Sequence, residues 1–144
     1  MANYCSAVRT NYFHVSDEGR FRKLMGQVYG CEDDVELWEE KDKDGQSVFG
    51  FGCYGGISGI PVATNEGEDE ENSYDLFIDR LQECVAEDDA IIIFEAGNEK
   101  LKYVAGRALV ITRSETKDID ITDLAVKEAA RMLGNSDWKT RCDY

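Results

Sequence analysis

Apolar and polar residues alternate in several short runs of this chain and repeat at helical spacing in others. The run 5–15 is rich in β-forming residues and predicts a first strand. Ser16 is a good helix N-cap, and the acidic residues after it suit a first helical turn. Phe21 and Leu24 then mark one face of a first helix, which Gly30 is expected to end.

The next two runs, 35–41 and 46–54, flank the turn residues Asp44 and Gly45. Two β-forming runs joined by Asp-Gly predict a hairpin. The first of its strands alternates apolar and acidic residues, so Trp38 and its acidic neighbours are expected on the outer face of that strand.

The middle of the chain predicts a loop, a helix and a buried strand. Residues 55–72 are rich in glycine and then in acid, which is typical of a long loop. Ser73 would cap a second helix with Phe77 and Leu81 on its inner face. The apolar run 90–95 predicts a central strand buried on both faces.

Three further elements complete the pattern. Residues 101–112 predict a long strand, Thr122 would cap a helix over 123–133 that Gly134 ends, and 138–144 predict an edge strand. The order is therefore β-α-β-β-α-β-β-α-β. It predicts a single domain, 1–144, of the α+β class, with a mainly antiparallel sheet and three helices packed on one face.

The net charge of the chain excludes more classes of function than its predicted helices and strands do. The chain has 30 acids and 16 bases, which give a net charge of -14. A field of that sign repels nucleic acid and anionic membranes, so direct nucleic-acid binding is excluded first and a basic protein surface is the favoured partner. No apolar run approaches the length of a membrane span, and the N-terminal residues lack the basic and apolar pattern of a signal segment, so neither is expected.

The cysteine and histidine pattern argues against a metal site and a disulfide framework. The chain has five cysteines at wide spacing, no CxxC pair and a single histidine, His14. Free thiols fit a reducing cytoplasm, which is the expected location. We expect no metal and no cofactor.

Two local motifs resemble ligand-binding loops, and each lacks a structural feature that binding of its ligand requires. Residues 50–55 read GFGCYG, but the glycines and Pro61 that follow forbid the helix that a dinucleotide fingerprint needs. Residues 40–45 read E-x-D-x-D-G, but Phe51 stands where a calcium loop needs a bidentate glutamate. The first motif is interpreted as a strand with close backbone approach, the second as a solvated hairpin turn.

Acidic residues gather in dense runs. Residues 32–44 hold eight acids and residues 66–71 hold five. These runs are interpreted either as a solubilising surface or as a surface that recognises a basic partner, with Trp38 as a candidate interface anchor. The predicted partner-binding residues are Glu32, Asp33, Asp34, Glu36, Trp38, Glu39, Glu40, Asp42, Asp44, Glu66, Glu68, Asp69, Glu70, Glu71, Glu87, Asp88 and Asp89.

Three segments resemble a family of small acidic proteins encoded on plasmids, conjugative elements and phages of Gram-positive gut bacteria. They are the opening MANY with RTNYFHVSDE, then VFGFGCYGGISG, then EKLKYVAGRALVIT. The resemblance implies a mobile-element setting, in which small acidic proteins oppose host nucleases by imitating DNA, as anti-restriction and anti-CRISPR proteins do. It implies no catalytic residue.

Three functions follow, in order of preference. The first is a binding protein without catalysis whose acidic face blocks a basic nucleic-acid-binding enzyme. The second is an interaction or self-assembly module of a mobile element, including a homodimer, in which Trp38 or the edge strand of the tail makes the contact. The third is an enzyme, which would need a cleft that brings together His14, Cys53 or paired carboxylates.

Overall fold

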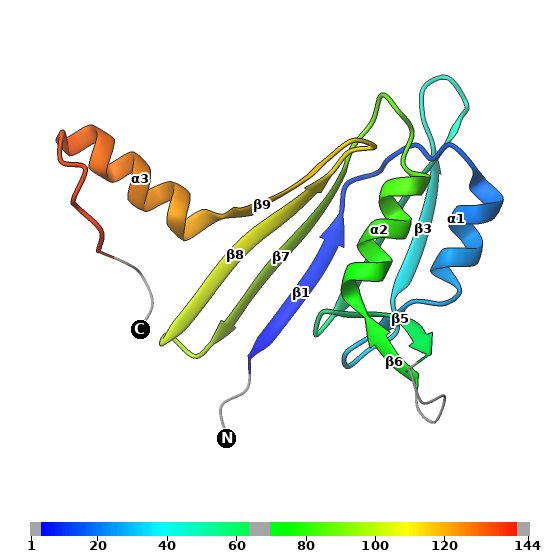
Figure 1. The fold of residues 1–144 in the computed structure, drawn as a ribbon, viewed down its shortest axis with the longest axis horizontal. Helices are drawn as coiled ribbons and strands as arrows, with labels where there is room; N and C mark the ends of the chain where they lie inside the picture. The colour runs from blue at the N-terminus through cyan, green and yellow to red at the C-terminus, as the bar shows by residue number, and fades with distance from the viewer. Residues whose placement is uncertain (1–3, 64–69, 141–144) are drawn as a thin grey trace.

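The computed structural model describes residues 4–63 and 70–140, and it arranges them in two antiparallel sheets and three helices (Figure 1). The larger sheet has the strand order β3-β4-β1-β7-β8-β9, and the smaller has the order β2-β5-β6. The strands are β1 (Cys5–Thr10), β2 (Tyr29–Gly30), β3 (Glu36–Lys41), β4 (Ser47–Tyr54), β5 (Ile57–Ala63), β6 (Glu70–Ser73), β7 (Ile91–Glu99), β8 (Tyr103–Ile111) and β9 (Thr116–Asp120). The helices are α1 (Glu18–Met25), α2 (Tyr74–Cys84) and α3 (Ile121–Leu133). The predicted α+β class, its antiparallel pairing and its three helices are confirmed.

Helices α1 and α2 cover one face of the larger sheet, and the core lies beneath them (Figure 1). Phenylalanine rings dominate this core, and neighbouring rings meet with centroids 5.0 to 6.2 Å apart, a favourable range for tilted and edge-on pairs. The fully buried rings are those of Phe13, Phe21, Phe49, Phe51 and Phe77. Strand β4 alternates Phe49 and Phe51 with glycine, so both phenylalanine rings point toward the helices.

Each helix begins at a side chain that accepts hydrogen bonds from the first turn. Ser73 caps α2 as predicted, with Oγ 3.1 Å from the backbone nitrogen of Leu76. Asp17 caps α1 in place of Ser16, whose backbone N–H and hydroxyl both donate to the last carbonyl of α2. Asp120 caps α3 in place of Thr122, because β9 continues directly into the helix.

The predicted loop at 55–72 is wrong, because β5 and β6 fall within it. Gly59 explains why the strand was missed. It has a φ of 127°, and a Cβ there would lie 2.2 Å from the carbonyl oxygen of Ser73, so only glycine allows the close pairing. The first helix also ends earlier than expected, at Met25, and Gly30 belongs to β2.

The C-terminal third differs from the prediction in two ways. Strand β9 was not expected, because its sequence TKDID is charged, but it pairs with β8 at the edge of the larger sheet. The predicted edge strand of the tail is not found over residues 138–140, and 141–144 lie outside the described residues.

Strand β7 lies between β1 and β8, so its central place is confirmed, but it is buried on one face only. Ile91 and Ile93 are 0% and 4% exposed, whereas Ile92 and Phe94 are 38% and 42% exposed. We call the side of the larger sheet opposite α1 and α2 the outer face.

No residue of α3 is buried, and the helix extends from the edge of the sheet outside the layer of α1 and α2 (Figure 1). The prediction that all three helices pack on one face therefore holds for α1 and α2 only.

Candidate functional site

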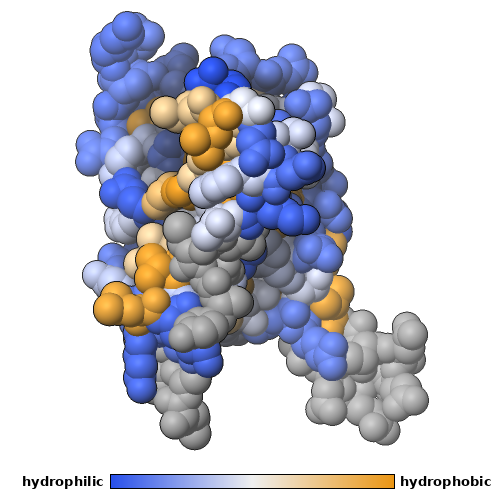
Figure 2. Space-filling view, turned by 90° about the vertical axis from the view of Figure 1, so that its left-hand side faces the viewer, coloured by the Kyte–Doolittle hydropathy of each residue, from blue (hydrophilic) through white to orange (hydrophobic). Residues whose placement is uncertain are grey.

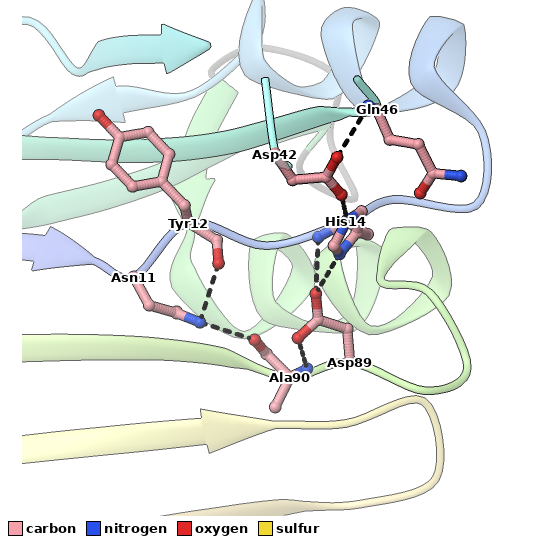
Figure 3. Close-up of polar contacts among 7 residues, drawn as sticks. All are labelled: Asn11, Tyr12, His14, Asp42, Gln46, Asp89 and Ala90. Atoms are coloured by element: carbon pink, nitrogen blue, oxygen red, sulfur yellow. Dashed lines mark hydrogen bonds and ion pairs between the residues drawn. The ribbon is translucent and has the colours of Figure 1, made fainter. Parts of the chain in front are cut away.

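Three loops meet at His14, at the end of the larger sheet that is uppermost in Figure 1 (Figure 3). The imidazole Nε2 lies 2.7 Å from Oδ2 of Asp42, in the β3–β4 hairpin. The imidazole Nδ1 lies 2.9 Å from Oδ2 of Asp89, in the loop between α2 and β7. The ring therefore joins two segments distant in sequence to the loop that follows β1.

The surrounding hydrogen bonds fix both carboxylates in place. Oδ1 of Asp42 accepts the backbone N–H groups of Asp44 and Gln46, each at 2.9 Å, so it closes the hairpin turn. This explains the E-x-D-x-D-G pattern as turn chemistry. Oδ1 of Asp89 accepts the backbone N–H of Ala90 at 2.8 Å, and the amide of Asn11 donates to the carbonyl of Ala90 at 3.0 Å.

The charged forms of His14, Asp42 and Asp89 stabilise one another. Hydrogen bonds to Asp42 and then to Asp89 raise the pKa of His14. The bond from His14 and those from the turn lower the pKa of Asp42. Burial opposes ionisation of Asp89, but the backbone N–H and the ring of His14 outweigh it, so the pKa of Asp89 is also lowered. A carboxylate oxygen at each ring nitrogen therefore favours the imidazolium form of His14.

This arrangement favours a structural clamp over a catalytic site. Both ring nitrogens of His14 are bonded to carboxylates, so neither has a free lone pair for a substrate. A polar hollow of about 430 Å³ opens beside the ring and reaches Ser47. The hydroxyl of Ser47, however, donates to Glu39 at 2.9 Å. The third hypothesis, an enzyme, therefore lacks an activated nucleophile at His14 among the described residues.

Cys53 is not brought to His14. Its thiol lies near the opposite end of β4 and donates to the carbonyl of Gly56 at 3.1 Å. Burial raises the pKa of this thiol, so the reactive thiolate is disfavoured. No helix follows the GFGCYG segment, since β5 begins at Ile57.

The glycines of that segment make room for Trp38. Its indole lies on the outer face of β4, where a Cβ on Gly52 would approach the ring to 2.9 Å and one on Gly50 to 3.3 Å. The guanidinium of Arg9 lies 5.2 Å from the ring centroid and stacks on the indole. The outer position of Trp38 agrees with the sequence prediction, and the ring is half-buried.

The predicted acidic set divides between the two ends of the larger sheet. Asp42 and Asp44 follow β3, and Glu87–Asp89 precede β7, so both lie at the upper end of Figure 1. Glu32–Asp34 precede β3 and lie at the lower end, where Glu32 contacts the backbone at Gly55. A six-residue strand separates the two groups by roughly 20 Å. The structure therefore forms two acidic clusters rather than one.

The members of the acidic set also differ in their partners. Asp42 and Asp89 hold His14, and Glu39 pairs with Arg22 at 2.5 Å. Nine others are exposed and make no ion pair within the described structure; they are Glu32, Asp33, Asp34, Glu36, Glu40, Asp44, Glu71, Glu87 and Asp88. Glu70 belongs to β6, whereas Glu66, Glu68 and Asp69 lie outside the described residues.

Sequence reasoning missed the apolar outer face. A shallow groove of about 310 Å³ runs over it, lined by Ala7, Trp38, Tyr54, Phe94 and Ala96 among others. The signal was hidden because the apolar run of β7 continues through inward and outward positions alike. The folded structure is needed to show which apolar residues of β7 lie on the outer face, where no layer covers them.

The chain matches none of the protein-family models, curated proteins or solved structures with which it was compared. Within residues 4–63 and 70–140, no three His, Cys, Asp or Glu side chains gather so that they could hold a metal ion. No helix in the same part of the chain has the length and apolar character that crossing a membrane requires.

Proposed function

We propose that this chain is a binding protein without catalysis, which uses carboxylates at the lower end of the larger sheet, together with one on β6 of the smaller sheet, to occupy a basic surface of a partner protein. The observation that carries this proposal is the state of Glu32, Asp33, Asp34, Glu36 and Glu71. All five are exposed, and none forms an ion pair with a described base. We call these five residues the lower acidic cluster.

Unpaired carboxylates of this kind suit a surface that normally holds phosphates. Duplex DNA presents about one negative charge per 1.7 Å of its axis, and proteins meet those charges with lysine and arginine. Carboxylates that have no partner of their own can take the place of phosphates without first breaking an internal ion pair. The net charge of -14 would also steer a basic partner toward the chain over long range.

The upper acidic residues are less suited to this role as a group, although Asp44, Glu87 and Asp88 among them are exposed and form no ion pair with a described base. Asp42 and Asp89 are held by His14, so their charges are partly neutralised within the fold. Lys41 and Lys43 belong to the same hairpin. We therefore place the partner contact at the lower end and treat the upper end as structural.

The partner class we propose is a nucleic-acid-binding enzyme of host defence, such as a restriction or CRISPR nuclease. The resemblance of the chain to small acidic proteins of mobile elements supports this choice. The proposed location is the cytoplasm, in keeping with free thiols at Cys5, Cys31, Cys53 and Cys84.

DNA cleavage by a panel of purified nucleases, measured with increasing amounts of this chain, tests the proposal. We expect at least one nuclease to be inhibited at low salt and released as salt is raised. Replacing Glu32, Asp33 and Asp34 together with Gln, Asn and Asn should abolish that inhibition. The matched control replaces Asp44, Glu87 and Asp88 in the same way and should leave it intact. Equal loss in both triple variants, or no inhibition of any nuclease at low salt, would contradict the proposal.

Self-association is a second candidate function, and a different observation favours it. The outer face and α3 both expose apolar side chains, and of the two only the outer face contributes a residue, Glu36 on β3, to the lower acidic cluster.

A further inference from the structure

Helix α3 exposes an apolar face that the chain does not cover. Leu124 is 55% exposed and Met132 is 73% exposed, although each lies on a well-formed helix with a cap at either end. Ile121, Ala125, Glu128 and Met132 share one side of the helix by their spacing, and the charge of Glu128 is matched there by its ion pair with Arg131. Figure 2 looks at this side of the molecule, where apolar groups lie at the surface among hydrophilic ones. Helices of globular proteins normally bury such a stripe.

The outer face of the sheet is the natural counterpart of this helix. A sheet buries an apolar face against another layer, and α1 and α2 already occupy the opposite side. Phe94, Ala96 and Val104 point outward and are exposed. They continue the apolar groove beside Trp38 toward β8.

The helix lies over its own sheet only at its first turn. Asp120 is both the last residue of β9 and the N-cap of α3, so no loop residue is available to reverse the chain. Contact with the parent sheet is made by Ile121, whose Cδ1 lies 2.9 Å from the position that a Cβ on Gly106 would take. From that point the helix extends past the edge of the sheet (Figure 1).

Charge favours a second copy of the same chain as the occupant. Two copies with a net charge of -14 repel one another through most of their surface. The outward positions of β1, β7 and β8, however, carry a single charged group, Arg9, and no carboxylate. The charges of α3 balance, because Asp123 and Glu128 are matched by Lys127 and Arg131. Glu36 and Glu40 stand on the outer face at its β3 edge, so the surfaces that lack the negative excess are α3 and the β1–β7–β8 part of the outer face.

We propose that the chain forms a two-fold dimer in which α3 of each copy lies on the outer face of the other. The contact is reciprocal, so it closes at two copies and leaves neither helix uncovered. A helix of this length is about 20 Å long and 10 Å wide, and burying half of it against a sheet removes roughly 600 Å² from water counting both surfaces. Two such contacts remove roughly 1,200 Å², which reaches the lower limit for a stable, specific interface.

The mass in solution, measured by light scattering or sedimentation, tests the proposal first. We expect twice the mass of one chain at about 100 µM protein, and the same mass in about 1 M NaCl, because an apolar contact is not screened by salt. Ala125→Glu on the exposed face of α3 and Ala96→Glu on the outer face should each give a monomer with unchanged circular dichroism. Both residues are exposed in the single chain, so these variants leave its core intact.

Two controls change the net charge by the same amount. Lys127→Gln lies on the opposite side of α3 from Ala125, and Leu101→Glu lies in the turn between β7 and β8. Both should remain dimeric. A monomeric wild-type chain at about 100 µM, or Ala125→Glu and Ala96→Glu variants that stay dimeric, would overturn the proposal.

A photo-crosslinking residue in place of Ala125 separates this dimer from other arrangements. With copies mixed from two isotope labels, we expect intermolecular crosslinks from position 125 to peptides of β1 or β7. Crosslinks from α3 to α3, which a simple helix pair would give, or to the lower acidic cluster would overturn the proposed contact. Nuclease inhibition by the monomeric variants is measured in a separate assay. A result that contradicts the proposed dimer would therefore not contradict the proposed function.

Discussion

One carboxylate oxygen, Oδ2 of Asp89, receives both the backbone N–H of His14 at 2.8 Å and the ring Nδ1 of the same residue at 2.9 Å. Asp89 thus fixes the position of the His14 backbone and the direction of its ring together. The ring can then reach Asp42 across the upper end of the sheet. The contact between these two loops and Asp42 of the β3–β4 hairpin therefore depends on the charge of a single imidazole.

The His14 clamp should give stability a defined pH dependence. The pKa of His14 is raised above its ordinary value of 6.5, so its contribution is full below 6.5 and is lost as the pH rises through the folded value. The pKa values of Asp42 and Asp89 are lowered from 3.8, so their contributions are full above 3.8 and are lost as the pH falls through the folded values. The free energy of unfolding of wild type should exceed that of His14→Gln most clearly between these limits.

Urea unfolding of both proteins at about pH 5.5 and about pH 8.5 measures this difference. Because the chain has one histidine, its NMR titration is a single curve that can be assigned without ambiguity. A difference in stability that stays constant across the range, or a His14 pKa at or below 6.5, would show that the clamp carries no charge.

The phenylalanine core should be the most sensitive part of the molecule. Phe51 is 0% exposed, and its ring packs edge-on against Phe13 and Phe77. Phe51→Ala should lower the free energy of unfolding by about 3–5 kcal/mol, because it leaves a cavity in a closed cluster. Leu101→Ala is the control; that side chain is 92% exposed, and its loss should change stability by less than about 0.5 kcal/mol. Similar effects of the two changes in urea unfolding would contradict the described core.

The two glycines beneath Trp38 should differ in their tolerance of a methyl group. A Cβ on Gly52 would lie 2.6 Å from the carbonyl oxygen of Val8, which is backbone and cannot move aside, so Gly52→Ala should cost about 1–3 kcal/mol. A Cβ on Gly50 would meet its nearest atoms at 3.3 Å, so Gly50→Ala should cost less. Combining Gly52→Ala with Trp38→Leu should recover only part of the loss, since the Val8 contact remains. Equal costs for the two glycines in denaturant unfolding would refute this account.

Thiol reactivity should separate the described cysteines into two pairs. Cys5 and Cys31 are exposed, whereas Cys53 and Cys84 are buried and burial raises the pKa of both thiols. Because the thiolate is the reactive form, an alkylating reagent at neutral pH should modify Cys5 and Cys31 first. Peptide mass mapping over time, with unfolded protein as the control for full reactivity, measures the order. Early labelling of Cys53 would mean that β4 opens more readily than its packing indicates.

The elements that could be predicted from the sequence were those whose signals are local. The hairpin around Gly45, the cap at Ser73 and the helix end at Gly134 each depend on a few adjacent residues, and the structure confirms them. Strands β5 and β9 were missed for a different reason. Glycine and proline interrupt the apolar residues of β5, and charged residues fill β9, so neither run has the composition of a strand. Each is held by pairing with a neighbouring strand of the chain, β5 with β6 and β9 with β8.

The His14 site and the outer face could not be predicted, because each depends on the three-dimensional arrangement. A lone histidine gives no sign that Asp42 and Asp89 will reach it from two other loops. A continuous apolar run such as that of β7 predicts a buried strand, and it does not reveal that Phe94 faces a side with no covering layer. The acidic residues were identified from the sequence, but their division between two ends of the sheet follows from the direction of β3.

The continuous joint at Asp120 also couples the motion of α3 to that of the sheet. A helix without a hinge at its base turns with the strand that carries it, so a change in the twist of β9 is passed on in full. A rotation of roughly 10° at the base would carry the tip of a 20 Å helix through about 3 Å. Any partner that reshapes the edge of the sheet would therefore reorient the far end of α3 as a lever does, without touching it.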